Sequence, residues 1–359
     1  MTETTQQKQT RHPVLITGAA GLIGTRLARA LLDQYPIIGF DVESRKEELP
    51  GVDWIDCDLT DANVVHRALK ELRDRHGDRL SSVVHLAAYY DFSGESSPLY
   101  DELTVQGTRR LLEGLRPFTV EQFVFSSTLL VMKPTSPGDV LTEESPGEAE
   151  WDYPKSKLIT EQLIAEQRGN TPAVILRIAG VYDEDCHSIP ISEQIRRIYE
   201  QELQSHFFPG NAEHGQSFLH LDDLADCLVR VIRRRTDLGP HEIFLVGEPD
   251  VVSYGELQDL IGEELHGTQW STLRIPKTVA KAGAWAEEKL GQDPFIKPWM
   301  IDLADSHYPV DISKARRLLG WQPRHSLREM LPEMLRRLPN DPVRWYDENK
   351  LQLPEQLPK

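Results

Sequence analysis

The stretch VLITGAAGLIG, residues 14–24, constrains the fold of this chain more than any other. Four uncharged residues precede three glycines, Gly18, Gly21 and Gly24, and apolar residues at helical spacing follow from Leu22 to Leu32. This order predicts a buried strand, a tight turn and an amphipathic helix. Unpaired N–H groups at the start of such a helix face whatever lies above the turn, and the missing side chains let a pyrophosphate approach. A glycine-rich turn that binds no ligand is the alternative interpretation.

Six further strand-like runs alternate with helix-like segments along the first 250 residues. Each run is short and apolar, as expected of strands that are buried on both faces of a parallel sheet. The alternation predicts an α/β fold, a Rossmann-type doubly wound parallel sheet with a smaller, mostly helical C-terminal lobe for the substrate. The runs comprise residues 36–41, 52–61, 81–88, 121–128, 173–182 and 242–248.

The chain divides into expected parts along this pattern. Residues 1–11 are polar without an apolar signal core, so we expect a disordered leader. A dinucleotide-binding domain is expected at 12–182, with 215–248 returning to it. Residues 183–214 interrupt the alternation and, with 249–339, are expected to form the substrate lobe, including helices at 253–267, at 279–291 and within 311–323. Residues 340–359 mix proline with charge and are expected to form a tail on the surface.

Charge and cysteine content narrow the expected partners. The formal net charge is −17, and the densest basic cluster, Arg233 to Arg235, fits a solvated helix end better than a groove for nucleic acid. Cys57, Cys186 and Cys227 lie far apart without a CxxC pair, so neither a disulfide framework nor a zinc site is expected. No stretch approaches the roughly 20 apolar residues of a membrane span. We therefore expect a cytoplasmic protein that acts on a small molecule, with no metal, nucleic acid or membrane as partner.

Two acidic residues after the second and third runs strengthen the nucleotide hypothesis. Asp41 ends the second run, where a carboxylate accepts hydrogen bonds from the adenosine ribose and repels a 2′-phosphate. This favours NAD over NADP, although Arg45 and Lys46 nearby keep NADP as an alternative. Asp58, with Leu59 beside it, can bind the adenine amino group, or it can cap the helix that follows.

A second constellation consists of Thr128, Tyr153 and Lys157. The phenol and the amine are four residues apart, so on a helix they share one face. Thr128 ends the run FSST, and open α/β sheets bind ligands at the carboxyl ends of their strands. An ammonium favours the phenolate of a neighbouring tyrosine, which can then take a proton from a hydroxyl while Thr128 hydrogen-bonds the reacting oxygen. A structural tyrosine with a solvated lysine is the alternative.

The motifs TGAAGLIG, DLTD, HLAA, FSST, YPKSK, LRIAGVY, FLHLDDLADCLVRVI and DISKARRLLGWQP occur in this order. Between Val14 and Leu331 the chain thereby resembles the extended short-chain dehydrogenase/reductases, the NAD-dependent epimerase/dehydratase family. The resemblance implies that Thr128, Tyr153 and Lys157 are catalytic, and that the chain forms a homodimer through the helix after TVQGT and the helix of YPKSK. It also implies NAD contacts from Gly18, Gly21, Leu22, Ile23, Gly24, Asp41, Asp58, Leu59, Leu86, Ala87, Ala88, Tyr153 and Lys157.

Several positions depart from the family pattern. Thr104 stands where the family usually has Asn, which is expected to loosen a hydrogen bond without removing catalysis. Thr128 is followed by two leucines, whereas sugar 4,6-dehydratases have an acid and a base there for eliminating water. Gly180 and Ser217 occupy positions at which nucleotide-sugar epimerases typically have Asn and Arg.

These observations predict an NAD-dependent oxidoreductase or epimerase that transfers hydride at a secondary alcohol carbon, with a nucleotide sugar as the leading substrate class. Residues 187–220 offer only Arg196, Arg197 and several histidines to a diphosphate, so a hydroxysteroid-like or other small alcohol or carbonyl is the alternative substrate. The aromatic run 89–92 can stack on nicotinamide or substrate, or pack under a loop. A non-catalytic NAD(P) sensor is a further alternative, which the retained Tyr153 and Lys157 disfavour.

Overall fold

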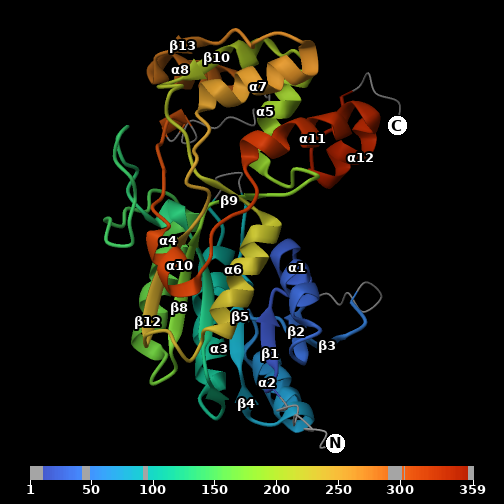
Figure 1. The fold of residues 1–359 in the computed structure, drawn as a ribbon, viewed down its shortest axis with the longest axis vertical. Helices are drawn as coiled ribbons and strands as arrows, with labels where there is room; N and C mark the ends of the chain where they lie inside the picture. Colours follow the sequence, from blue (N-terminus) through green and yellow to red (C-terminus); the bar gives the residue numbers. More distant parts are fainter. Residues whose placement is uncertain (1–10, 43–48, 92–95, 290–300, 303, 355–359) are drawn as a thin grey trace, which may run out of the picture.

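A seven-stranded parallel sheet forms the centre of the computed structural model, which describes residues 11–42, 49–91, 96–289, 301–302 and 304–354 (Figure 1). The strand order is β12-β8-β7-β5-β1-β2-β3, so the chain winds outward in both directions from the boundary between β1 and β5. Such a reversal point is where open α/β sheets bind ligands. The strands are β1 Val14–Thr17, β2 Ile37–Asp41, β3 Val52–Asp56, β5 Ser82–His85, β7 Phe123–Thr128, β8 Ala173–Ile178 and β12 His241–Val246.

Alternate residues of the strands supply two apolar cores, one on each face of the sheet. Val14 and Ile16 face one core, whereas Leu15 faces the other, as the two-residue period of a strand requires. The first face is covered by α1 (Leu22–Leu31), α6 (Leu221–Arg233) and α10 (Ser313–Leu319). The second face is covered by α2 (Ala62–His76), α3 (Gln106–Leu115) and α4 (Asp152–Gln167). The predicted doubly wound fold is therefore confirmed.

The second lobe lies beyond the carboxyl ends of the strands, at the top of Figure 1. Its own core contains buried side chains of α5 (Ile189–Tyr199), α7 (Tyr254–His266), α11 (Leu327–Asn340) and α12 (Pro342–Glu348). Small elements complete the fold: α8 (Lys277–Lys289), the pairs β9 (Gly180–Tyr182) with β11 (Phe218–His220), β10 (Phe207–Pro209) with β13 (Leu273–Ile275) and β4 (Arg79–Leu80) with β6 (Thr119–Val120), and the short helices η1 (Tyr100–Val105), η2 (Leu129–Val131) and η3 (Leu203–His206).

Two predicted segments differ in detail. The run 173–182 is not one strand, because β8 ends at Ile178 and β9 leaves the sheet to pair with β11. Within the range expected for the substrate lobe, α10 instead packs on the sheet, and Ala315 and Leu319 belong to its first core. The predicted glycine stop is confirmed, because Gly320 ends α10 at a φ of 63°.

The expected surface tail is the clearest error of the sequence analysis. Pro342 begins helix α12, a position that suits proline because the first N–H of a helix has no partner. Trp345 and Tyr346 are 2% and 0% exposed and pack in the core of the second lobe. The Tyr346 hydroxyl also donates to Glu200 at 2.6 Å. Residues 1–10 of the expected leader, which was placed at 1–11, and the end of the tail, 355–359, lie outside the described residues.

Candidate active site

The glycine turn lies directly against the loop that follows β5. Gly18 N–H donates to Phe40 O at 2.9 Å and has a φ of +69°, and a Cβ there would lie 2.8 Å from Ala87 N. A Cβ at Gly24 would clash with the Gly18 carbonyl. These two glycines are therefore required by the turn itself. Gly21 is exposed, and the nearest atom to a Cβ there is Gly18 O at 3.4 Å, so it is not required by internal packing.

Helix α1 begins at this turn without a cap of its own. Gly21 is the residue before the helix, no side chain caps it, and the first turn contains no acidic residue. Leu22 is 40% exposed and Ile23 is half-buried. The first N–H groups of the helix and the positive end of its dipole therefore face the space above Gly21. Such a helix start attracts an anion.

Asp41 stands at the end of β2 beside this turn. Its Oδ2 accepts the Ala20 N–H and its Oδ1 accepts the Val42 N–H, each at 2.8 Å. The carboxylate is thus fixed next to the glycine turn, where it is able to accept a ribose hydroxyl. Arg45 and Lys46, which kept NADP open, lie outside the described residues.

One interpretation of the sequence made Asp58 the cap of helix α2, and in the structure Asp58 does not cap it. The cap is Asp61, whose Oδ1 accepts N–H groups of Asn63 and Val64. Asp58 Oδ1 instead accepts the backbone N–H and the hydroxyl of Thr60, at 2.8 and 2.7 Å. This bonding leaves its role toward adenine as a proposal, together with that of the buried Leu59.

The loop Leu86–Ala88 is half-buried and continues the pairing of β1 with β5. Leu86 N–H donates to Thr17 O at 3.1 Å, and Ala87 N–H reaches Thr17 Oγ1 at 3.3 Å. These bonds place the loop at the carboxyl edge of the sheet, next to Gly18.

A buried hydrogen-bond chain that the sequence analysis missed supports this loop. Burial lowers the pKa of His85 to about 3, so the ring is neutral and has one donor and one acceptor nitrogen. Thr108 donates to Thr104 O at 2.6 Å, so its oxygen accepts from His85 Nε2 at 2.8 Å. Thr17 then donates to His85 Nδ1 at 2.6 Å. Thr104 Oγ1 accepts the Tyr89 N–H at 3.0 Å, so this position still fixes the loop without an Asn.

Tyr153, Lys157 and Thr128 come together as the spacing predicts. Thr128 ends β7 and hydrogen-bonds the Tyr153 phenol, which opposes the upward shift that burial causes in the pKa of this phenol. Lys157 Nζ lies 5.9 Å from the centre of the Tyr153 ring and donates to Ser126 O at 2.7 Å. Lys157 is 3% exposed, and this burial lowers its pKa to about 7.

The three groups share the sheet edge with the glycine turn. Ser126 Oγ donates to His85 O at 3.2 Å, and His85 is joined to Thr17 beside Gly18. The loop after Ala88 reaches the phenol directly, because the rings of Tyr90 and Tyr153 meet edge to face at 5.1 Å. The nucleotide-binding candidates and the proton-transfer candidates therefore border one region.

Aromatic side chains flank the phenol. Besides Tyr90, which is 51% exposed, Trp151 packs at a tilt 5.5 Å from the Tyr153 ring. Tyr89 meets Tyr100 edge to face at 4.8 Å. Phe92, the last member of the aromatic run, lies outside the described residues. The phenol consequently has aromatic surface beside it that is able to contact a ring.

The cations expected to face a diphosphate have other partners. Arg196 pairs with Glu193, Glu200 and Glu202 at 3.0, 3.2 and 2.6 Å. Arg197 Nε donates to Glu193 O, and burial lowers its pKa. Ser217, which is 1% exposed, donates to Glu248 O at 2.7 Å. At Gly180 a Cβ would lie 2.9 Å from the Phe218 ring, so a larger side chain does not fit this arrangement.

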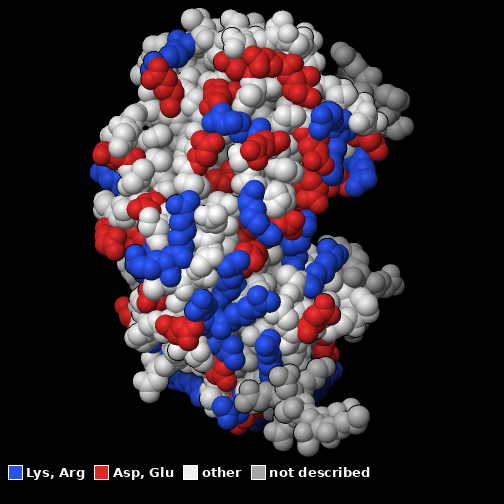
Figure 2. All heavy atoms as spheres, viewed as in Figure 1, with Lys and Arg blue, Asp and Glu red and all other residues white. Residues whose placement is uncertain are grey.

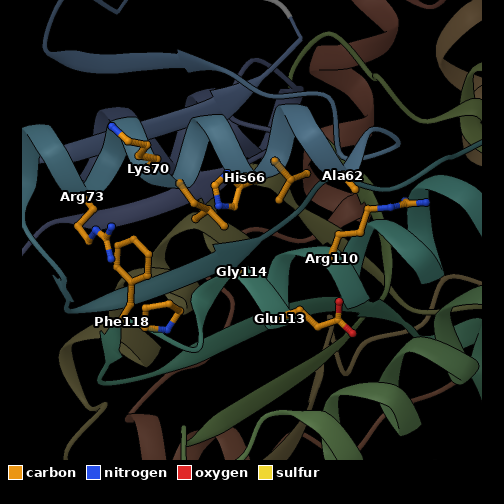
Figure 3. Close-up of a pocket in the computed structure, with 11 residues that line it drawn as sticks. Ala62, His66, Lys70, Arg73, Arg110, Glu113, Gly114 and Phe118 are labelled. Atoms are coloured by element: carbon orange, nitrogen blue, oxygen red, sulfur yellow. The ribbon is translucent and has the colours of Figure 1, made fainter.

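A groove of about 540 Å³ between α2 and α3 lies away from these residues. Figure 3 shows it lined by both helices and Phe118, with Lys70, Arg73 and Arg110 among the labelled side chains. Apolar residues such as Leu69 also line it. None of the predicted catalytic or nucleotide-binding residues contributes to it. We therefore do not interpret it as the active site.

A cluster of possible metal ligands, His220, Asp222 and His325, lies at the start of α6. His220 Nδ1 accepts the Asp222 N–H at 3.2 Å, so in the neutral ring Nε2 carries the proton and has no lone pair for a metal. Asp222 is paired with Arg26 at 2.7 Å, and His325 Nδ1 bonds Asp223 at 3.0 Å. The donor set thus fits a hydrogen-bonded contact between the lobes better than a metal site.

Basic side chains gather over α6 and α10 on the face shown in Figure 2. Several of them are paired: Arg230 with Asp226 at 2.8 Å, and Arg235 with Glu121 at 2.6 Å. This pairing reduces the field that a nucleic acid would meet. Among the described residues, no helix is both long and apolar enough to cross a bilayer.

Comparison with known proteins gives one family match. The NAD dependent epimerase/dehydratase family matches residues 14–247. The chain is 26% identical over 354 residues to mouse 3 beta-hydroxysteroid dehydrogenase type 7, covering 88% of this chain and 92% of that protein. It is 24% identical over 363 residues to the yeast sterol-4-alpha-carboxylate 3-dehydrogenase, decarboxylating, covering 93% and 98%.

Solved structures share the fold at lower identity. UDP-glucose 4-epimerase from Thermus thermophilus, in complex with NAD, superimposes with a TM-score of 0.68 at 21% identity, covering 90% of this chain and 98% of that one. MoeE5 in complex with UDP-glucose and NAD gives a TM-score of 0.66 at 23% identity, covering 92% and 100%.

Proposed function

The chain belongs to the NAD dependent epimerase/dehydratase family, and on this premise we propose that it is an NAD-dependent dehydrogenase of a secondary alcohol with Tyr153 as the proton acceptor. The convergence of Thr128, Tyr153 and Lys157 at the edge that also bears Gly18 carries this proposal. A sensor that only binds the dinucleotide needs no proton acceptor, so this convergence disfavours the non-catalytic alternative.

The residues around the glycine turn fit NAD. Gly21 and the first N–H groups of α1, at Leu22, Ile23 and Gly24, would hold the pyrophosphate. Asp41 would hold the adenosine ribose and disfavour a 2′-phosphate. Bound NAD supplies the hydride acceptor for alcohol oxidation. In the same proposal Asp58 and Leu59 border the adenine, and Leu86, Ala87 and Ala88 border the middle of the dinucleotide.

Side chains of the protein would remove the proton of the substrate hydroxyl. The Tyr153 phenolate takes the proton of the substrate hydroxyl, and the Thr128 hydroxyl donates to the reacting oxygen. The Lys157 ammonium favours the phenolate and would also bind a ribose hydroxyl. Its amine is held by Ser126 O, so little conformational freedom is lost when it acts.

An uncharged alcohol on an apolar ring system is the substrate class that the site favours. Tyr90 and Trp151 flank the phenol with aromatic surface, and Arg196 is occupied by three glutamates. A diphosphate needs cationic partners, and Arg196 is not free to act as one. Two relatives over most of the chain are named as dehydrogenases of hydroxysteroids and sterol carboxylates. We therefore place the hydroxysteroid-like alternative ahead of the nucleotide sugar.

A homodimer through α3 and α4 is part of the proposal. Ile159 on α4 is 50% exposed although it is a large apolar residue, which suits an interface. Analytical ultracentrifugation of the wild-type chain and of I159D measures the mass of each in solution. A dimeric wild type and a monomeric I159D would support this interface. A monomeric wild type would contradict it.

A substrate panel tests the reaction. Purified protein is mixed with NAD or NADP and either a 3β-hydroxysteroid or UDP-glucose, and NADH absorbance is followed together with product analysis. We expect NADH to accumulate with the steroid and NAD, and not with Y153F. Conversion of the UDP-sugar to its epimer without net NADH would instead establish the nucleotide-sugar function, and turnover unaffected in Y153F would overturn the proposed proton acceptor.

A further inference from the structure

Glu161 is a buried carboxylate one helical turn after Lys157, and it joins three elements of the fold. It lies on α4 and is 6% exposed. Its Oε1 accepts from Arg177 Nε of β8 at 3.2 Å, and its Oε2 accepts from Arg177 Nη2 at 2.8 Å. The hydroxyl of Ser127 on β7 donates to the same Oε1 at 2.5 Å. Three charge-assisted hydrogen bonds therefore lock this carboxylate in place.

Ser127 stands between the two β7 residues that contact the proposed catalytic pair. The carbonyl of Ser126 accepts from Lys157 Nζ at 2.7 Å, and the hydroxyl of Thr128 bonds the phenol of Tyr153. Because neighbouring side chains of a strand point to opposite faces, Ser127 holds the strand from the side opposite to Thr128. The bond from Ser127 to Glu161 thus fixes the end of β7 against α4, which bears Tyr153 and Lys157.

Glu161 also supplies negative charge near the Lys157 amine. Burial lowers the pKa of Lys157 to about 7, and Glu161 is the group that raises it. Two other groups lie near the amine: His85 on β5, which is neutral, and the Phe125 ring on β7, whose centre is 4.8 Å from Nζ. The causes that shift the pKa of Tyr153 are burial, Thr128 and Tyr100, so Glu161 has no direct effect on the phenol and acts through the position of Thr128.

We propose that Glu161 is a positioning residue of the reaction, because through Ser127 it orients the end of β7. This strand end holds the Lys157 amine by the carbonyl of Ser126 and the Tyr153 phenol by Thr128. This proposal rests on the proposed roles of Tyr153 and Lys157. Arg177 supports this role, because it holds the carboxylate in its orientation and its positive charge offsets the free energy of burying the carboxylate.

The sign of the effect follows from the bond between Thr128 and Tyr153, which lowers the pKa of the phenol. Without the Glu161 carboxylate the end of β7 loses its contact to α4, and this bond is weakened. The pKa of Tyr153 is then raised further. A purely structural role for Glu161 would lower the melting temperature and leave the titration of the phenol unchanged.

The test is the ultraviolet titration of the Tyr153 phenol in the presence of NAD, which needs no identified substrate. The phenolate signal of Tyr153 is the difference between each protein and its own Y153F counterpart. In E161Q we expect the midpoint to rise by about one pH unit, a tenfold loss of phenolate at a given pH. In S127A, which keeps the carboxylate but removes its bond to β7, we expect a similar rise. E193Q serves as the matched control, because Glu193 is equally buried at 6% exposed and pairs with Arg196 on α5.

The double variant E161Q/R177Q keeps the test decisive if E161Q does not fold, because it leaves no unpaired buried guanidinium. A midpoint in E161Q, or in the double variant, equal to that of the wild type and of E193Q would overturn the positioning role. Failure of the proposed function has a different signature: Y153F would then retain turnover in the substrate panel. A raised midpoint together with an inactive Y153F supports both.

Discussion

Lys157 Nζ lies 2.7 Å from the carbonyl oxygen of Ser126, and this hydrogen bond holds the amine 5.9 Å from the centre of the Tyr153 ring. The amine thus has its position before any ligand binds, and strand β7 determines that position. A preorganised amine of this kind stabilises a charge that develops later without a cost of rearrangement.

Tyr153→Phe removes the proton acceptor and keeps the ring. We expect the rate of alcohol oxidation to fall at least about 100-fold, because general-base catalysis contributes about this much or more. The ring contacts with Tyr90 and Trp151 remain, so the melting temperature and NAD affinity stay close to those of the wild type. Stopped-flow kinetics and calorimetric NAD titration measure these quantities. A variant with wild-type turnover would contradict the assignment.

The rate of oxidation should rise with pH. Burial raises the pKa of Tyr153, so near neutrality the phenol holds its proton and the base form is scarce. Oxidation needs the phenolate and speeds up as the pH rises toward that pKa, whereas reduction of the ketone needs the phenol and slows down. Rates in both directions measured across pH 6–10 test this. Parallel profiles for the two directions would be inconsistent with one shared phenol.

Local patterns made much of the site predictable from the sequence. The turn at Gly18, the strand end at Asp41 and the turn of helix from Tyr153 to Lys157 each depend on residues close together in the chain. The expectation of a surface tail at 340–359 failed at Trp345, because proline and charge around it obscure a short helix whose burial depends on α11.

Contacts set by the register between distant elements were not predictable. The hydrogen-bond chain from Thr17 through His85 to Thr108 depends on how β1, β5 and α3 are placed relative to one another. In the sequence these residues stand out from other polar residues by no pattern. The cap of α2 could have been found, because Asp61 directly precedes the first helical residue, whereas Asp58 stands three residues earlier.

Substitutions in the glycine turn should separate folding from binding. Gly21→Ala meets only Gly18 O at 3.4 Å, so we expect little loss of stability and at least about tenfold weaker NAD binding, because the methyl group takes pyrophosphate space. Gly18→Ala should destabilise the fold strongly, since its Cβ meets backbone and its φ is positive. Gly77→Ala, with a φ of +82° and open space, is the control and should cost about 1 kcal/mol. Unchanged NAD affinity in Gly21→Ala would argue against this turn as the pyrophosphate site.

Asp41→Asn should change the choice of dinucleotide. The amide oxygen is still able to accept the Ala20 N–H, so the turn keeps its shape while the negative charge is lost. A 2′-phosphate is then no longer repelled, and we expect the ratio of NADP to NAD affinity to rise about tenfold or more. Fluorescence titration with NADH and NADPH measures the ratio. An unaltered ratio would show that Asp41 does not face the ribose.

His85→Gln should make the fold less sensitive to acid. Burial depresses the pKa of His85 to about 3 from an ordinary 6.5, so the neutral ring contributes stability that is present above pH 6.5 and is lost as the pH falls toward 3. The wild type should therefore lose up to several kcal/mol across this window from His85 alone. His85→Gln is less stable at pH 7, because it disrupts the bonds to Thr17 and Thr108, but its free energy of unfolding should fall less steeply below pH 6.5.

Urea unfolding at a series of pH values gives both slopes, and His66→Gln at an exposed position of α2 is the control. Equal slopes in His85→Gln and the wild type would mean that the buried ring takes no proton on unfolding in this range.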